Sequence, residues 1–590
     1  MRALYSTVVA GALALVAAPD SRYADDFEFL KTTVKREFAA LKKKGVDWDA
    51  VCERFEPKFA SCASDAEHVK NVMEMLASLR DSHTGVTQSK VDWKELPGKA
   101  DGLFGGGLLF GYDDGKFVLR GVMHGHPLGS TVPLGSVLVG VGDEPAWFAM
   151  ERERRRAQRF GGASTEHGFW ASLSNRLLPF GAKNEIQATF LTPEKKTRTV
   201  AVPRWGPGGK SFDFVSNYLP EGVEWKEGAS SAFVHEKGAG RKIGFLKITG
   251  SMDAATVKAF HAAFDALKGM DGLLLDCRSM GGGGDDSAWE MAGRLFPKAT
   301  PYGRRRLEPS GAWQFDGPVV MLQDEVMVSS AETFTWAVSE TKRVVSVGRP
   351  TGGWGIIPRS FPLPSGLATF RLGVSDRATP LLGVHTEGIG WPPDVLVPFG
   401  PVLSATGHDL SPLVNEKAPD PVLAIGATIL DVLLSGVPAD EARAAFHALA
   451  EGDAPAFAAF SKKGAAKAAG MGPKGDRLAK LFADDLEAEI ALERAALALG
   501  EPGLAPDCLG AARRLPRLLA RAKKSGAAAA AAAAALDKAV KAGRAEAAAQ
   551  EALLAALDES FTLPEKAAKP FLSKHGATAI GKFVKSASSR

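Results

Sequence analysis

The sequence predicts an α/β fold, on two observations. Between residues 241 and 398 lie four short apolar runs rich in β-branched side chains: IGFLKI, GLLLD, PVVMLQ and RVVSVG. The first two are separated by a helical pattern with Asp253 as its expected N-cap and one apolar face made by Val257, Phe260, Phe264 and Leu267. Strands that alternate with helices predict a mainly parallel sheet, and ligand chemistry usually lies at the carboxyl ends of its strands.

Length and composition limit the class of protein. At about 150 residues per domain, 590 residues predict several compact units. Hydrophobic residues make up 45% and charged residues 24%, which is typical of a chain that folds. A net charge of +4 is too small to indicate nucleic-acid binding. Four cysteines exclude a disulfide-built scaffold and lack zinc-site spacing, although Cys52 and Cys62 could either pair or remain buried thiols.

The N-terminus predicts the compartment. Arg2 precedes an apolar run of small residues from Ala3 to Ala18, which is typical of a secretory signal. We therefore expect a signal peptide at 1–18 and an extracytoplasmic chain, either periplasmic or secreted. An uncleaved anchor and a buried helix are the alternatives. No other stretch reaches the roughly 18 to 20 apolar residues of a membrane span, so none is expected in the mature chain.

Residues 19–100 predict a helical domain. Apolar residues recur at helical spacing in two segments, first at Leu30, Val34, Phe38 and Leu41 and then at Val69, Val72, Met73, Leu76 and Leu79. Ser64 and Glu67 have the spacing of a capping box before the second segment. That segment ends in a polar turn that contains Ser82 and His83.

Residues 101–205 change to short β-like runs punctuated by glycine, and they resemble a PDZ domain with a helical insertion from about 151 to 177. PDZ domains bind an extended peptide as an added strand and capture its terminal carboxylate. The resemblance implies peptide binding at Gly106, Gly107 and Leu108. The remaining domains are expected at 206–425, which holds the α/β pattern, and at 426–590, an alanine-rich helical region for which packing or partner docking is the expected role.

Two segments of the α/β region suggest acyl chemistry. In VMVSSAETF, Ser329 stands where a buried strand leads into a helix, so its hydroxyl and the following N–H groups suit a nucleophile beside an oxyanion site. The alternative is that Ser329 or Ser330 only caps the helix. In LLLDCRSMGGGGDD the glycines allow amides such as those of Gly281 and Gly282 to converge on an anion, or they form a flexible loop.

Three further side chains are candidates. His83 could act as a base near neutral pH, although a single histidine at a helix end is more often structural. Glu387 lies in a Gly/Pro-rich loop and would by itself be a solvated carboxylate. The pair His124 and His126 could suggest a metal, but two ligands without a carboxylate more often belong to a polar turn.

Taken together, these segments resemble the C-terminal-processing and tricorn-type serine protease family. The family pattern appears here in five ordered motifs, at 79–83, 276–283, 329–332, 348–353 and 387–394, and the resemblance spans about 25 to 425. It implies a crotonase-like ββα core at 206–425, an N-terminal helical domain, a PDZ-like domain and peptide-bond hydrolysis. Polypeptide substrates, recognised at their C-termini by the PDZ-like domain, are the implied partners.

The same resemblance assigns the branch and the site residues. Where one branch has a catalytic lysine, this chain has Trp354, whereas the tricorn-like tetrad is complete. Ser329 is then the nucleophile and His83 the base. Ser82 and Glu387 orient the base, and the N–H groups of Ser330 and of Gly282 or Gly281 form the oxyanion hole. Glu332 is expected to stabilise the start of the helix. No metal or organic cofactor is implied.

Two other interpretations remain open. One is a catalytically silent protein that holds a peptide or a lipophile on the same fold. The other is a different acyl-handling enzyme on a crotonase-like core, which would keep the glycine-rich loop but not the serine and the histidine. Neither the substrate sequence nor the oligomeric state follows from the sequence.

Overall fold

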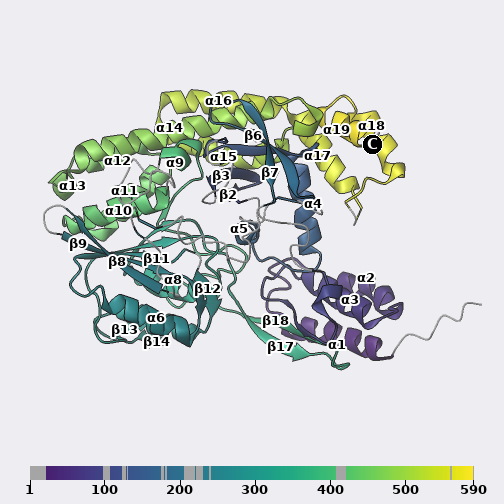
Figure 1. Cartoon of the computed structure of the whole chain (residues 1–590), viewed down its shortest axis with the longest axis horizontal. Coiled ribbons are helices and arrows are strands. Elements are labelled where there is room, and N and C mark those ends of the chain that lie inside the picture. Colours follow the sequence, from purple (N-terminus) through teal and green to yellow (C-terminus); the bar gives the residue numbers. More distant parts are fainter. Residues whose placement is uncertain are drawn as a thin grey trace, which may run out of the picture. The chain divides into compact units, whose positions relative to one another are not determined.

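The structure is a computed structural model (Figure 1), and it describes two compact units. Unit 1 comprises the described residues of 1–98, 159–162 and 358–375, and unit 2 those of 99–158, 163–357 and 376–590. The described residues are 21–97, 107–122, 128, 131–173, 178–179, 183–204, 219–220, 223, 230–237, 241–278, 280–406, 420–468, 470–558 and 561–588. The predicted signal at 1–18, Gly106 and the pair His124 and His126 lie outside them.

Unit 1 contains the predicted helical domain. Its helices are α1 (Ser21–Glu37), α2 (Trp48–Ala60) and α3 (Asp65–Ala77), and α2 was not among the two predicted segments. The predicted apolar residues within α1 and α3 are buried, but α1 ends before Phe38 and Leu41, and Leu41 is partly exposed. Ser64 caps α3 by accepting the N–H of Glu67 at 3.2 Å, but the Glu67 carboxylate accepts the N–H of Ala63 and not that of Ser64. The short helix η1 (Trp93–Glu95) follows β1 (Gly85–Ser89). A sheet in the order β1-β18-β17 completes the unit, with β17 at Ile356–Pro362 and β18 at Ala368–Asp376.

A six-stranded sheet forms the centre of unit 2. Its order is β19-β16-β15-β11-β9-β8, with β8 antiparallel to β9 and the other neighbours parallel. The four apolar runs of the sequence are confirmed as strands β9 (Arg241–Ile248), β11 (Gly272–Asp276), β15 (Val319–Gln323) and β16 (Val345–Gly348). Strands β8 (Ser230–Lys237) and β19 (Val395–Leu396) form the edges.

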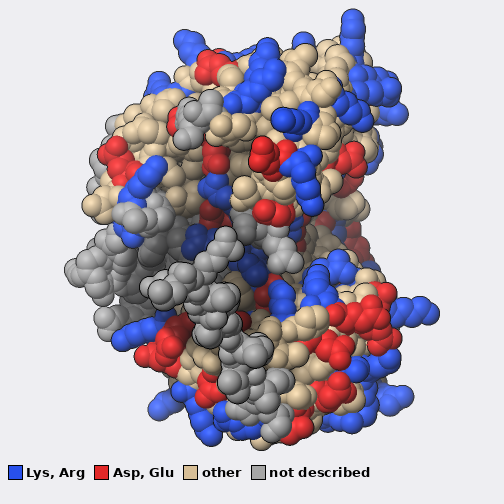
Figure 2. Space-filling model, turned by 90° about the vertical axis from the view of Figure 1, so that its right-hand side faces the viewer, with Lys and Arg blue, Asp and Glu red and all other residues tan. Residues whose placement is uncertain are grey.

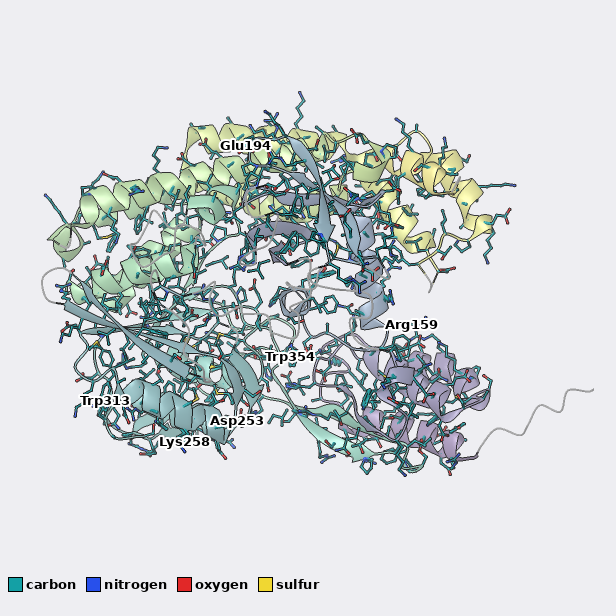
Figure 3. The ribbon with its side chains drawn as sticks, viewed as in Figure 1. Arg159, Glu194, Asp253, Lys258, Trp313 and Trp354 are labelled. Atoms are coloured by element: carbon teal, nitrogen blue, oxygen red, sulfur yellow. The ribbon has the colours of Figure 1, made fainter. Side chains whose placement is uncertain are left out.

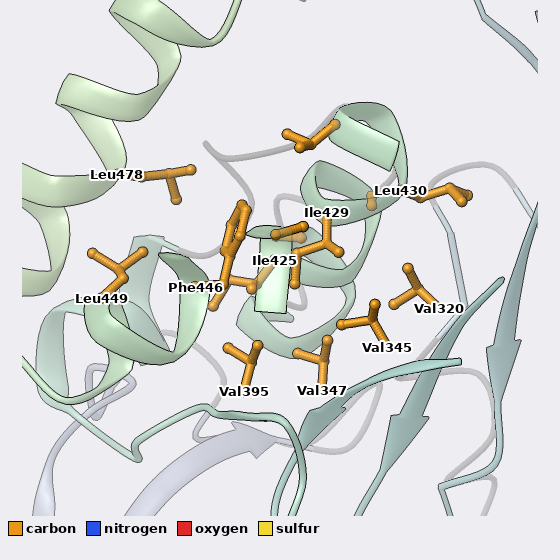
Figure 4. Packing of buried hydrophobic residues seen from close by; sticks show 14 of the residues in the cluster. Val320, Val345, Val347, Val395, Ile425, Ile429, Leu430, Phe446, Leu449 and Leu478 are labelled. Carbon is orange, nitrogen blue, oxygen red and sulfur yellow. The ribbon is translucent and has the colours of Figure 1, made fainter. Parts of the chain in front are cut away.

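Both faces of this sheet are covered, because side chains alternate along each strand. Leu274, Val320 and Val347 pack with α10 (Pro421–Leu434) and α11 (Ala439–Ala450) in the cluster of Figure 4. Leu273 and Met321 pack on the other face with α6 (Ala254–Asp265), α7 (Asp285–Ala292) and α8 (Ser330–Glu340). Asp253 caps α6 by accepting the N–H of Thr256 at 2.8 Å, as predicted.

A second, antiparallel sheet of unit 2 has the order β2-β3-β4-β6-β7. Its strands are β2 (Leu108–Asp113), β3 (Lys116–Val122), β4 (Val137–Val141), β6 (Glu185–Leu191) and β7 (Thr197–Pro203), and β5 (Glu144–Pro145) pairs with β4. The expected helical insertion contains α4 (Ala146–Gln158) and α5 (Glu166–Ser172). Trp170 of α5 packs on Tyr112 and Phe117, so α5 belongs to the core of this sheet.

The C-terminal region is helical, as predicted. The alanine run lies in α16 (Ala527–Ala542), where Ala529, Ala533 and Leu536 are buried in a cluster with residues of α14 (Met471–Leu497) and α15 (Cys508–Ser525). Its small side chains therefore pack against other helices of the region. The remaining helices are α9 (Pro401–Thr406), α12 (Ala454–Ser461), α13 (Gly464–Ala468), η6 (Pro502–Leu504), α17 (Arg544–Ala556), α18 (Glu565–His575) and α19 (Ala579–Ser588).

Three general features bear on the sequence expectations. Cys52 and Cys62 are both free thiols, so the pairing alternative is not realised. Among the described residues, no helix combines the length and the apolar character needed to cross a membrane. Figure 2 shows Lys and Arg side chains interspersed with Asp and Glu on the face that it draws.

Candidate active site

Ser329 stands directly before α8, at the N-cap position, and is half-buried. Its backbone has φ 57° and ψ −122°, whereas an ordinary N-cap residue has an extended backbone with negative φ. A non-glycine residue in such a conformation is uncommon and must be held by its surroundings. The serine therefore does more than end a regular strand and begin a regular helix.

Ser330 differs from its neighbour. It is buried, and its hydroxyl lies 2.8 Å from the carbonyl oxygen of Gly283 and 3.0 Å from Asp285 Oδ1. Asp285 also accepts from Thr333 at 2.9 Å and from Arg377 at 2.6 Å. Burial alone would raise the pKa of the Asp285 carboxyl, but Arg377 and these hydroxyls hold it below its ordinary value. Ser330 thus connects the helix to the glycine-rich loop.

The glycine-rich loop packs against Ser329. It contains strand β12 (Met280–Gly283), which pairs in parallel with β10 (Gly250–Met252). A Cβ placed on Gly282 would lie only 2.6 Å from the Cβ of Ser329 and 3.0 Å from its Oγ. Only glycine fits this approach, so the backbone of Gly282 can lie directly beside the Ser329 hydroxyl.

The start of this loop is fixed by buried charges. Asp276, at the end of β11, receives Arg278 Nε at 2.9 Å and Nη2 at 2.8 Å, and it lies 3.0 Å from Lys247 Nζ. Arg278 also reaches Asp420, the N-cap of α10, at 2.9 Å. Burial would raise the pKa of Asp276, but Arg278 and Lys247 lower it overall. These ion pairs hold the chain that leads into Gly281 and Gly282.

Glu332 receives four hydrogen bonds in a fully buried position. Its Oε2 accepts the N–H of Ser329 at 3.0 Å and that of Trp354 at 2.7 Å, and its Oε1 accepts the Thr351 hydroxyl at 2.6 Å and the N–H of Gly353 at 3.1 Å. Burial raises the pKa of Glu332 to about 7, against the lowering effect of these donors. The predicted role at the helix start is confirmed, but the carboxylate also holds the segment 351–354. Figure 3 labels Trp354.

Glu387 lies on a loop that packs against the same segment. The N–H of Gly388 donates to the carbonyl of Gly353 at 3.1 Å, and the N–H of Trp391 donates to the Thr351 hydroxyl at 2.6 Å. Glu387 is buried, with 1% of its surface exposed, and is therefore not the solvated carboxylate that its loop alone suggested. The structure brings Ser329, Ser330, Gly281 and Gly282 together and places Glu387 in the same unit.

Ser82 and His83 belong to unit 1. His83 is buried, and its backbone N–H donates to the Asp81 carboxylate at 3.1 Å. The carbonyl of Asp81 accepts the N–H of Thr84 at 3.2 Å, and β1 begins one residue later. The turn that carries the serine and the histidine is therefore fixed by its own acidic residue.

Two family models match the chain. The model of peptidase family S41 matches residues 242–397, and that of the tricorn protease C1 domain matches residues 19–77. The first match covers the central sheet except its edge strand β8, together with α8, the glycine-rich loop and Glu387. The two matches support a peptidase of the C-terminal-processing and tricorn type within family S41. The chain is a serine-type peptidase, as the resemblance implied.

The chain also resembles several solved structures, among them these three. Mature CPAF has 16% sequence identity, covers 71% of this chain and 99% of its own, and gives a TM-score of 0.49. A photosystem II D1 C-terminal processing protease has 19% sequence identity, and the match covers 68% of this chain and 99% of the protease, with a TM-score of 0.40. The tricorn protease has 16% sequence identity, and the match covers 72% of this chain and 37% of the tricorn chain, with a TM-score of 0.35. No curated protein matches this S41 peptidase.

Three residues that contact the segments around Ser329 were not predicted from the sequence. Asp285 and Thr351 lie within or beside recognised motifs, but their contacts with Ser330 and Glu332 join segments far apart in the sequence. His167, whose Nε2 lies 2.9 Å from the carbonyl of Thr351, comes from the predicted insertion and had no local signal. Among the described residues, no group of three or more potential ligands could hold a metal ion.

Proposed function

We propose that the protein hydrolyses peptide bonds by acyl transfer, with Ser329 as nucleophile. The observation that carries this proposal is the contact of Gly282 with Ser329 at the N-terminus of α8. The half-exposed serine, its unusual backbone and the adjacent glycine backbone suit attack on a carbonyl that is then held by backbone amides. The hydroxyl of Ser330 is already used in contacts with Gly283 and Asp285, which favours Ser329 over its neighbour.

The proposed base is His83. A neutral imidazole would take the proton of the Ser329 hydroxyl during attack and later protonate the leaving amine. Ser82 and Glu387 would orient this imidazole and adjust its basicity. The oxygen of the tetrahedral intermediate would accept hydrogen bonds from the N–H groups of Ser330 and of Gly282 or Gly281. One such donor contributes about 3 to 4 kcal/mol in the transition state. Departure of the amine leaves an ester on Ser329, and a water molecule, deprotonated by His83, would then attack this ester, release the acid and restore the hydroxyl.

Substrate selection is proposed for the sheet β2-β3-β4-β6-β7, as a PDZ-like domain at 101–205. Strand β2 lies at the end of this strand order, which is the position where an extended peptide can be added. Gly107 and Leu108 stand at the start of β2, next to Gly106, and would receive the C-terminus of the substrate. The proposed activity is therefore that of a serine endopeptidase that recognises the C-termini of its polypeptide substrates through the PDZ-like domain. The other proposed domains are a helical domain at 19–100, a crotonase-like core at 206–425 and a helical region at 426–590. The proposed signal at 1–18 would direct the chain out of the cytoplasm.

Labelling with a fluorophosphonate tests the nucleophile. Wild type should be labelled on Ser329, Ser329→Ala should not, and His83→Ala should be slower by about 10² to 10⁴. Ser330→Ala is the matched control, because it removes the neighbouring hydroxyl and keeps the backbone amide, so its labelling should persist. Absence of labelling and of peptide cleavage in wild type would favour the silent binding protein. Loss of labelling in Ser330→Ala alone would show that Ser330, and not Ser329, is the nucleophile.

A pair of matched peptides tests the proposed recognition. A substrate with a free C-terminal carboxylate should be cleaved with a lower KM than the same peptide with a C-terminal amide, because the amide lacks the charge that backbone N–H groups bind. Equal KM values would contradict recognition of the C-terminus and leave the hydrolytic mechanism intact. N-terminal sequencing of the protein recovered outside the cytoplasm tests the signal at 1–18.

A further inference from the structure

The four partners of Glu332 are all hydrogen-bond donors. Three are backbone N–H groups, of Ser329, Gly353 and Trp354, and the fourth is the Thr351 hydroxyl. An ionised carboxylate accepts at both oxygens, whereas a protonated one carries an O–H that needs an acceptor. Three of the four partners are N–H groups that can only donate, and the Thr351 hydroxyl also accepts the N–H of Trp391. The arrangement therefore favours the ionised form of Glu332, which accepts from all four.

One oxygen of this carboxylate holds the backbone of the nucleophile. Oε2 accepts the N–H of Ser329, the residue with φ 57°, and also the N–H of Trp354. A backbone in a rarely populated region costs of order 1 to 3 kcal/mol and persists only where the surroundings fix it. The helix holds the carbonyl of Ser329 through the N–H groups of Glu332 and Thr333, at 2.8 and 3.2 Å, and the Glu332 carboxylate holds its N–H at 3.0 Å. The side-chain bond therefore fixes the end of this residue's backbone that the helix does not hold and opposes its relaxation.

The other end of the contact is itself held firmly. Thr165, the N-cap of α5, donates to the carbonyl of Gly352 at 2.6 Å, and His167 Nε2 lies 2.9 Å from that of Thr351. Because α5 is packed into the core of the second sheet through Trp170, the segment 351–354 is a fixed support. Glu332 thus connects the nucleophile to a rigid part of unit 2.

We propose that Glu332 is a positioning residue for the acyl-transfer reaction: its ionised carboxylate holds Ser329 in the conformation that presents the hydroxyl, and protonation releases it. This inference rests on the proposed function of Ser329. It goes beyond the role at the helix start, because a capping residue would affect stability, whereas a positioning residue also makes the reactivity of Ser329 depend on its own charge.

Two carboxylates on the elements next to Glu332 are paired with arginines. On the side of α7, Asp285 is paired with Arg377, and before α8 Glu325 is paired with Arg349 at 2.9 Å. The titratable groups of the other adjoining elements are His167 of α5 and Glu387 of the following loop. The contacts of Glu332 itself are neutral donors, and burial raises its pKa to about 7, so its charge changes in the range where the enzyme is assayed.

The test is the rate of fluorophosphonate labelling against pH. Labelling of wild type needs Glu332 ionised and His83 neutral. A plot of the logarithm of its rate against pH should therefore have a slope of about two below both pKa values. The same plot for Glu332→Gln should have a slope of about one, because only His83 titrates. At pH 8 Glu332→Gln should be slower by about 100-fold, comparable to the loss of one preorganised donor. Peptide hydrolysis should lose kcat with little change in KM.

Two variants of Thr351 sharpen the test. Thr351→Ser keeps the hydroxyl and should behave as wild type. Thr351→Val removes one donor to the carboxylate, which favours the protonated form, so the midpoint attributed to Glu332 should move upward by about one pH unit. Glu332→Asp keeps the charge on a shorter side chain and should recover part of the rate. Thermal unfolding at pH 8 shows which variants are folded.

The outcomes separate this inference from the proposed function. If wild type is not labelled on Ser329, the proposed function is wrong. If wild type is labelled and a folded Glu332→Gln keeps both its rate and a slope of two, Glu332 is a structural residue only and the inference is overturned. The inference also fails if Thr351→Val leaves the midpoint of a labelled enzyme unchanged.

Discussion

Two buried groups of charge in unit 2 are stabilised in opposite ways. Glu332 has four neutral donors around one carboxylate. The hairpin network, in contrast, joins charges of both signs from the β2–β3 turn, α14 and α15. Its members are Asp113, Lys116, Glu489, Glu493, Arg514, Arg517 and Arg521.

The hairpin network is held by short contacts. Lys116 Nζ donates to Glu489 at 3.2 Å, and Arg517 donates twice to Asp113, at 2.7 and 2.6 Å. Arg514 donates to Glu493 at 2.5 Å and to the carbonyl of Asp114. Burial would raise the pKa of Glu489, but Lys116 and Arg521 lower it overall. Burial would likewise lower the pKa of Lys116, but Glu489 and Asp113 raise it.

The difference shows what each kind of partner can do for a buried carboxylate. Opposite charges keep the hairpin network ionised, so it fastens the C-terminal helices to the β2–β3 turn over a wide pH range. Neutral donors only partly offset the burial of Glu332, so its charge remains sensitive to pH. A scaffold needs the first property, and a group that controls a nucleophile can use the second.

The largest expected effect comes from removing one partner of the hairpin network. Arg514→Ala leaves Glu493 as a buried carboxylate that has lost its strongest partner, and Arg514 is only 4% exposed. Breaking a buried pair in this way costs about 3–5 kcal/mol. We expect a lower denaturant midpoint and faster hydrogen exchange in β2 and β3.

Lys480→Ala is the control, because Lys480 pairs with Asp484 on an exposed surface of α14, and its midpoint should not change measurably. An Arg514→Ala variant as stable as this control would mean that water compensates for the lost charge. The hairpin network would then not stabilise the fold, and its proposed contrast with Glu332 would be wrong.

The second prediction concerns the pH dependence of stability at Glu332. Its pKa is about 7 in the folded chain, above the value of about 4.3 expected when unfolded, so the folded state retains a proton that the unfolded state has lost. The stability from this proton is fully present below the unfolded pKa and is lost as the pH rises through 7. Between pH 5 and pH 8 wild type should lose on the order of 2–3 kcal/mol more than Glu332→Gln.

Denaturant unfolding of both proteins at the two pH values measures this difference. Parallel pH profiles would show that Glu332 keeps the same charge throughout, and the distinction between neutral and charged partners would fail. If stability falls with rising pH as predicted, the fold is least stable when Glu332 is ionised, although the ionised form is the one proposed to position Ser329. Stability and reactivity would then favour different charge states of Glu332.

The sequence predicted the parts of this picture that depend on neighbouring residues. The strands β11 and β15 follow from unbroken apolar runs, and their alternate side chains, such as Leu273 and Leu274, fill the two opposite cores. Asp253 was predicted as a cap because its partner Thr256 is three residues away. Ser329 and Gly282 were recognised because each stands in a motif of its own.

The contacts between distant segments could not be predicted in this way. Asp113 and Arg517 are 404 positions apart, and neither stands in a motif. The role of Glu332 at the helix start follows from its spacing to Ser329, but its bonds to Thr351 and Trp354 depend on how the segment 351–354 packs against the start of α8. Burial, which decides the charge state of Glu332, is likewise a property of the assembled fold.

The smallest effect is expected from Arg517→Lys. The Arg517 side chain is 36% exposed, and a lysine keeps the charge but loses one of the two parallel bonds to Asp113. Because water screens this side of the network, the loss should be about 1 kcal/mol in the free energy of unfolding. Measured beside Arg514→Ala, the variant separates charge from geometry at one carboxylate. If Arg517→Lys lost as much free energy of unfolding as Arg514→Ala, the stabilisation by each residue of the hairpin network would depend on the two-bond geometry of arginine and not on the depth of burial.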